Sequence, residues 1–144
     1  MKIVKKFAAV LAFVFTALTA QSEEMKKPEL DGYCPVCYIA AGKAVEGKKE
    51  YAVEHEGKTY LFVNNEAVSA FEKEPAKYLP AYDGWCAYGI SLGKKFESDP
   101  TVFKVVDGRL FLNKSPEVGE LFSKGTEGHI SKADAEWKKM AMVK

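Results

Sequence analysis

Residues 51–63 (YAVEHEGKTYLFV) predict the first β-hairpin of this chain. Aromatic and β-branched residues stand on both sides of Glu56-Gly57, and such runs around a glycine turn are typical of hairpins. A second stretch, residues 101–112, has Asp107-Gly108 at its centre, which is the strongest short-range hairpin signal. We therefore expect two antiparallel hairpins, one in each half of the chain.

Helix signals follow each hairpin. Asn64 or Asn65 is placed to cap a helix that starts near residue 66, and Pro75 ends it. After the second hairpin, Ser115 supplies a cap and Pro116 occupies the first helical position, where proline is favoured. The second of these helices is expected to run to about residue 122.

The remaining segments are harder to assign. Residues 31–38 are expected to form a loop, and residues 85–93 either a short helix or an irregular aromatic segment. Gly125 and Gly128 predict a break, after which Ser131 would cap a last helix. Two hairpins with several short helices predict a single small α+β domain, and no internal repeat is apparent.

The first twenty residues have the three parts of a secretory signal peptide. Lysines at positions 2, 5 and 6 are followed by an apolar run at 7–18 and by small residues before a cut after Ala20. The alternative, an uncleaved membrane anchor, needs a run of about 20 apolar residues, and this run is shorter. We expect a periplasmic or secreted protein with no integral membrane segment after cleavage. Residues 21–30 are a polar lead-in, and residues 31–144 form the domain.

Charge excludes some partners. Cleavage removes three lysines and no acidic residue, so the formal charge changes from +1 to −2. A nucleic-acid partner needs a basic face, and an electrostatic membrane binder needs positive charge. Neither is expected here, and the sequence shows no serine triad, phosphate-binding loop or paired carboxylate motif.

Three cysteines carry the chemistry that the sequence offers. Cys34 and Cys37 are two residues apart, and Cys86 follows much later. The pair suits one soft metal ion or a redox dithiol, and a third thiolate would suit copper(I) better than zinc, which takes four ligands. An odd thiol count in an oxidising compartment cannot be fully paired within one chain. A disulfide with one spare thiol and an inert, buried Cys86 are the alternatives.

Other polar and aromatic side chains carry less weight. His55 and His129 are each more typical of a solvated or hydrogen-bonded histidine than of a metal ligand, although either is a candidate fourth donor. Several aromatic residues cluster around the cysteine segments and form either the wall of a ligand pocket or the core and its rim. They are Tyr33, Tyr38, Tyr78, Tyr82, Trp85 and Tyr88.

Several segments together resemble the exported, single-domain YHS proteins of bacteria, over nearly all of the chain after residue 30. The segments are YCPVCY at 33–38, GKAV at 42–45, GKTYLFV at 57–63, PAKYLP at 75–80, GWCAYG at 84–89, VDGRLFLN at 106–113 and ISKAD at 130–134. The resemblance implies a small α+β domain, and related short modules occur in metal-transport ATPases and metal-handling proteins.

The chain departs from that family's pattern in its sulfur positions. Cys34 stands where an Asp is common, and Cys37 stands at a variable place. The metal-binding modules have a cysteine after the Phe of the second hairpin strand, whereas Phe62 is followed here by Val63. The implied metal site therefore consists of Cys34, Cys37 and Cys86.

The sequence thus predicts an exported protein that binds a soft metal, copper(I) before zinc, for sequestration or delivery. Its partners would be the metal ion and a metal-handling protein, and a role without catalytic turnover is favoured. The alternatives are a periplasmic thiol–disulfide oxidoreductase that uses Cys34 and Cys37, and a non-catalytic module that binds a ligand or a partner.

Overall fold

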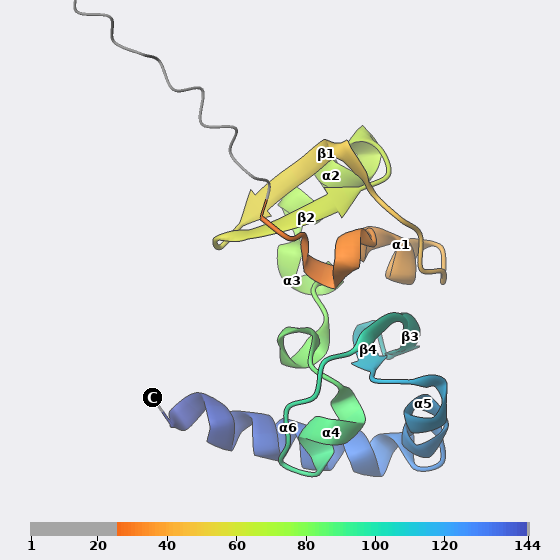
Figure 1. Cartoon of the computed structure of the whole chain (residues 1–144), viewed down its shortest axis with the longest axis vertical. Coiled ribbons are helices and arrows are strands. Elements are labelled where there is room, and N and C mark those ends of the chain that lie inside the picture. The colour runs from red at the N-terminus through yellow and green to blue at the C-terminus, as the bar shows by residue number, and fades with distance from the viewer. Residues whose placement is uncertain (1–25, 144) are drawn as a thin grey trace, which may run out of the picture.

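The computed structural model describes residues 26–143, in which two lobes are stacked (Figure 1). The expected signal peptide at 1–20 lies outside the described residues. Within residues 26–143 there are six α-helices, two short 3-10 turns and two antiparallel two-stranded hairpins. The prediction of a small single α+β domain is confirmed.

The first lobe holds one hairpin and three helices. Its elements are η1 (Glu29–Gly32), α1 (Pro35–Ala40), β1 (Lys48–His55), β2 (Lys58–Phe62), α2 (Asn65–Lys73) and α3 (Pro75–Tyr78). Asn64 caps α2 as expected, because its side chain accepts a hydrogen bond from the backbone N–H of Ala67 at 2.8 Å. The second helix of the lobe therefore starts where the sequence signal placed it.

The second lobe has the same order of elements, with a long helix in the place of the short α3. Its elements are η2 (Ala81–Gly84), α4 (Ala87–Ser91), β3 (Asp99–Val106), β4 (Arg109–Asn113), α5 (Pro116–Ser123) and α6 (Thr126–Met142). Ser115 caps α5 through a bond from the N–H of Val118, which matches the expected Ser-Pro start.

The two lobes repeat one backbone, so the expectation of no internal repeat is wrong. Strands β3 and β4 lie 51 residues after β1 and β2, and each hairpin shifts register near its start, between Lys48 and Ala52 or between Asp99 and Phe103. Each hairpin turn places an acidic residue and a glycine at positive φ, Glu56-Gly57 in the first and Asp107-Gly108 in the second.

The repeat extends to the cysteine segments. Three consecutive residues before each first helix have positive φ, at 57°, 49° and 88° for 30–32 and 59°, 52° and 83° for 82–84. In both lobes this turn leads to a cysteine that immediately precedes a short helix, Cys34 before α1 and Cys86 before α4. The sequence repeats here as well, because Asp31-Gly32-Tyr33-Cys34 corresponds to Asp83-Gly84-Trp85-Cys86.

Two local expectations are wrong. Residues 35–38, the second half of the expected loop, belong to helix α1, because Pro35 occupies the first helical position and starts the helix rather than breaking it. Helix α6 begins at Thr126, not after Ser131, and runs through Gly128. A glycine inside a helix costs only about 1 kcal/mol relative to alanine, and the length of α6 and its packing on α4 offset that cost.

A hydrophobic cluster joins the lobes. Tyr38 of α1 packs with Leu110 and Leu112 of β4, and its ring meets that of Phe103 edge-on at 4.9 Å. The Tyr38 hydroxyl donates a buried hydrogen bond of 2.7 Å to the carbonyl of Pro100, which lies where the register of β3 shifts. The first helix of one lobe is therefore fastened to the hairpin of the other.

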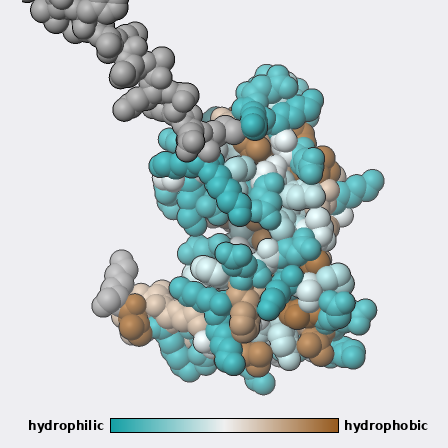
Figure 2. Space-filling model, in the orientation of Figure 1, coloured by the Kyte–Doolittle hydropathy of each residue, from teal (hydrophilic) through white to brown (hydrophobic). Residues whose placement is uncertain are grey.

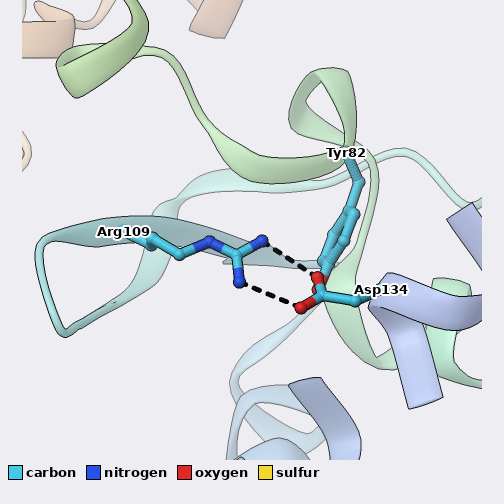
Figure 3. A network of polar contacts seen from close by, with 3 residues as sticks. All are labelled: Tyr82, Arg109 and Asp134. Atoms are coloured by element: carbon cyan, nitrogen blue, oxygen red, sulfur yellow. Dashed lines mark hydrogen bonds and ion pairs between the residues drawn. The ribbon is translucent and has the colours of Figure 1, made fainter. Parts of the chain in front are cut away.

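Helix α6 is held by a polar network at the edge of the second lobe (Figure 3). The Asp134 carboxylate accepts hydrogen bonds from the Tyr82 hydroxyl at 2.8 Å and from two guanidinium nitrogens of Arg109 at 2.9 and 3.1 Å. The bonds from Arg109 hold the pKa of Asp134 below its usual range. The network ties α6 to η2 and to the start of β4.

The visible face of the molecule is mostly hydrophilic, with hydrophobic residues in small separate patches (Figure 2). Met142 and Val143, at the end of α6, are the most exposed of the large hydrophobic residues in the described part. None of the helices in residues 26–143 has both the length and the apolar character that a membrane crossing needs.

Candidate functional site

The Cys34–Cys37 pair sits at the start of α1. Cys34 precedes the helix in an extended conformation, and its backbone N–H donates to the carbonyl of Val45 at 2.8 Å. Cys37 is the third residue of the helix. Residues three apart in a first helical turn lie on one face, so the local fold brings the two sulfurs together.

The surroundings of the pair are apolar. Cys34 is 0% exposed and Cys37 is 9% exposed, in a cluster with Phe62, Phe71 and Tyr60. Burial, followed by a hydrogen bond with Cys34 and the charge of Cys34, raises the pKa of Cys37 to about 12. The Cys37 thiol is therefore neutral at physiological pH, and a neutral thiol is a poor nucleophile.

Cys86 has a different environment. It is 1% exposed, and its Sγ accepts a hydrogen bond from the N–H of Gly89 at 3.5 Å and donates one to Oδ1 of Asn113 at 3.6 Å. The same Asn113 oxygen accepts the N–H of Tyr88 at 3.0 Å. Cys86 thus contributes hydrogen bonds that fix the start of α4 against β4.

The structure brings together two of the three predicted sulfur ligands. Across residues 26–143, no group of three or more Cys, His, Asp or Glu side chains is placed to hold one metal ion, so Cys86 does not join Cys34 and Cys37. Metal binding by these cysteines stays a prediction, and in this arrangement it concerns only Cys34 and Cys37. Whether Cys86 lies near Cys34 and Cys37 depends on how the two lobes are arranged, and the spacing of the cysteines along the chain does not determine that arrangement.

The two histidines lie apart from the sulfur pair. His55 meets the ring of Phe71 edge-on at 5.4 Å, and its Nε2 is 3.9 Å from Oε1 of the exposed Glu56. His129 packs between aromatic rings in the second lobe, with Tyr88 at 5.1 Å. These contacts give each histidine a packing role.

The six aromatic residues near the cysteines do not form one wall. Tyr82, Trp85 and Tyr88 belong to the cluster of the second lobe, Tyr33 and Tyr38 to the cluster between the lobes, and Tyr78 to the cluster of the first lobe. Their main role is to fill the core and its rim.

Comparison with known proteins identifies no relative: no family model, no curated protein and no solved structure matches this chain. The chemistry of the site therefore has to be argued from its own residues. What those residues offer is a buried dithiol at a helix start, placed in the first lobe, and a hydrogen-bonded single thiol at the corresponding place in the second.

Proposed function

We propose that this protein binds copper(I) through the thiolates of Cys34 and Cys37. The observation that carries the proposal is the pairing of two buried thiols at the start of α1, inside an apolar cluster, where Cys34 acts directly on the pKa of Cys37. Thiolates are the ligands that soft metals select, and copper(I) is soft. A buried pair of sulfurs with few competing polar groups suits such an ion.

The ligand count favours copper(I) over zinc. Structural zinc sites take four ligands, and the described residues offer no group of three or more Cys, His or carboxylate side chains. Copper(I) accepts a smaller, sulfur-only set. The proposed ligand set is therefore Cys34 and Cys37, with Cys86 outside it.

The raised pKa of Cys37 makes binding depend on pH. Copper(I) must displace the Cys37 proton, whose pKa is about 12. Between pH 6 and 8 the apparent affinity should then rise at least about tenfold for each pH unit. Burial of both sulfurs also makes entry and release slow, which suits sequestration or handover to a metal-handling partner better than turnover.

The resemblance to exported YHS proteins supports the same role. In this proposal residues 1–20 direct export, and the domain acts in the periplasm or outside the cell. The chain would keep copper(I) away from other thiols there.

A thiol–disulfide oxidoreductase is the second candidate. The position of Cys34 directly before a helix favours it, since redox dithiols commonly occupy helix starts. Burial argues against it, because redox catalysis needs a thiolate that is accessible and has a low pKa, and the pKa of Cys37 is raised.

A competition experiment tests the proposal. Reduced protein is titrated anaerobically against a coloured copper(I)–chelator complex, together with Cys37→Ser and Cys86→Ser. We expect one copper(I) per chain for the wild type and for Cys86→Ser, in which a hydroxyl can replace the hydrogen bonds of the thiol, and loss of binding for Cys37→Ser. Equal binding by wild type and Cys37→Ser would refute the proposal. Trapping of a mixed disulfide by the same variant would favour the redox alternative.

A further inference from the structure

A cavity of about 430 Å³ lies between the two lobes. Its first-lobe wall comes from η1, the turn between β1 and β2, and Tyr60, and its second-lobe wall comes from η2, Trp85 and the segment before β3. Binding sites for small molecules are commonly 300–1,000 Å³ and often lie between structural units. The cavity is thus large enough for a small organic molecule.

The lining of the cavity is predominantly acidic. Five carboxylates and two lysines belong to it: Glu29, Asp31, Glu56, Asp83, Glu97, Lys27 and Lys58. One of the lysines is already engaged, since Lys27 Nζ lies 3.4 Å from Asp31. The excess negative charge favours a cationic occupant.

Three of these carboxylates act on the Tyr60 hydroxyl. After burial, the charges of Glu29, Asp83 and Glu56 raise the pKa of the Tyr60 hydroxyl to about 12. They come from η1, η2 and the first hairpin turn, so both lobes contribute to the same field. A cation seated near Tyr60 would feel all three.

The chemistry of the wall excludes a bare metal ion and suits a larger cation. In the described part of the chain, no three Cys, His or carboxylate groups converge closely enough to ligate one ion. Apolar surface from Trp85, Leu79 and Leu112 lies beside the carboxylates. The wall therefore offers carboxylates for the charged end of a molecule and apolar surface for its body.

We propose that the cavity between the lobes binds a small organic amine, with its ammonium group facing the carboxylates of Glu29, Glu56 and Asp83 and its apolar body against Trp85 and Leu112. This site is separate from the Cys34–Cys37 pair. It needs no metal, and its ligand belongs to a different chemical class.

The test compares two probes that differ in charge. Phenethylamine and phenethyl alcohol have the same ring and chain, and only the first is a cation at neutral pH. Binding is measured by calorimetry and by tryptophan fluorescence in phosphate buffer, which contains no competing amine. We expect phenethylamine to bind at least about tenfold more tightly than the alcohol, and the difference to shrink at high salt.

A pair of matched variants locates the site. Asp83→Asn removes one carboxylate of the cavity and keeps a residue that tolerates the positive φ of 52°. Asp107→Asn makes the same change at a φ of 49° in the second hairpin turn, outside the cavity. We expect Asp83→Asn to weaken phenethylamine binding about fivefold or more and Asp107→Asn to leave it unchanged.

Three outcomes would overturn the proposal: no measurable binding of phenethylamine, equal binding of the amine and the alcohol, or equal losses in the two variants. None of them depends on copper(I), so failure here and failure of the dithiol proposal are distinguishable.

Discussion

Replacing Tyr38 with phenylalanine should expose the Cys34–Cys37 pair more often while the rest of the fold stays closed. The change removes a hydroxyl and keeps the ring, so the edge-on contact with Phe103 remains. It deletes the buried 2.7 Å bond to Pro100 and leaves that carbonyl without the donor supplied by Tyr38. Losing such a bond costs about 1–2 kcal/mol.

That free energy translates into a change in rate. Helix α1 carries Tyr38 and Cys37, so weakening its attachment to the second lobe lowers the cost of opening around the thiols. A loss of 1–2 kcal/mol corresponds to a factor of about 5–30 in the open population. We expect the rate of modification of Cys34 and Cys37 by N-ethylmaleimide to rise by that factor.

Cys86 serves as the internal reference for this measurement. Peptides are separated after timed exposure to the reagent, and mass spectrometry gives the rate at each segment. Cys86 lies in the other lobe and should react at its wild-type rate. Tyr82→Phe, which removes a buried tyrosine hydroxyl in the second lobe, is the matched control and should leave the pair unchanged. If Tyr38→Phe accelerates all three cysteines equally, the whole molecule opens at once and the reasoning is refuted.

Three further predictions concern stability and are measured by urea or thermal unfolding of reduced protein. Asp134→Ala should cost about 1–2 kcal/mol, because the buried Tyr82 loses the acceptor of its hydroxyl while the half-exposed pair with Arg109 contributes little, and the cost should fall by about 1 kcal/mol in a Tyr82→Phe background. Burial raises the pKa of Cys37 to about 12, so the contribution of its neutral thiol to the free energy of unfolding is complete below pH 9 and is lost as pH rises from 9 toward 12. Wild type should therefore lose about 2 kcal/mol more of this free energy than Cys37→Ala by pH 10.5. Gly47→Ala should destabilise the fold by about 1–3 kcal/mol, because a Cβ there would lie 2.5 Å from the Leu61 backbone, whereas Gly128→Ala, with open space around it inside α6, should stabilise it by about 0.5–1 kcal/mol.

Each of the three stability predictions has a result that would contradict it. Additive losses in Asp134→Ala and Tyr82→Phe would mean that the two groups are not coupled. Parallel pH curves for wild type and Cys37→Ala would mean that the thiol ionises equally well in both states. Destabilisation by Gly128→Ala would contradict the start of α6 at Thr126.

Much of the fold follows from local chemistry. The Glu56-Gly57 and Asp107-Gly108 turns adopt the positive φ values that such pairs favour, so both hairpins could be predicted. The caps at Asn64 and Ser115 could be predicted for the same reason, since each side chain bonds a backbone N–H three residues on.

What could not be predicted depends on contacts between distant segments. The predicted start of α6 is too late because Gly128 looks like a breaker, whereas its cost of about 1 kcal/mol is offset by the packing of the rest of α6 on α4. The pairing of Cys34 with Cys37 is local and was expected, whereas the separation of Cys86 from them is set by the two lobes. The cavity was missed because its carboxylates come from segments that are far apart in sequence.

The repeated backbone gives the molecule a symmetry that its side chains share only in part. The backbone N–H of Lys43 donates to the carbonyl of Cys37, and the N–H of Lys94 donates to the carbonyl of Gly89 in the same way. Cys37 in the first lobe therefore corresponds to Gly89, which has no side chain, in the second. The cavity is walled by both left-handed turns, η1 and η2, which have matching shapes and carry the same pair of residues, Asp31-Gly32 and Asp83-Gly84. A molecule held between them therefore contacts one copy of the repeated turn from each lobe.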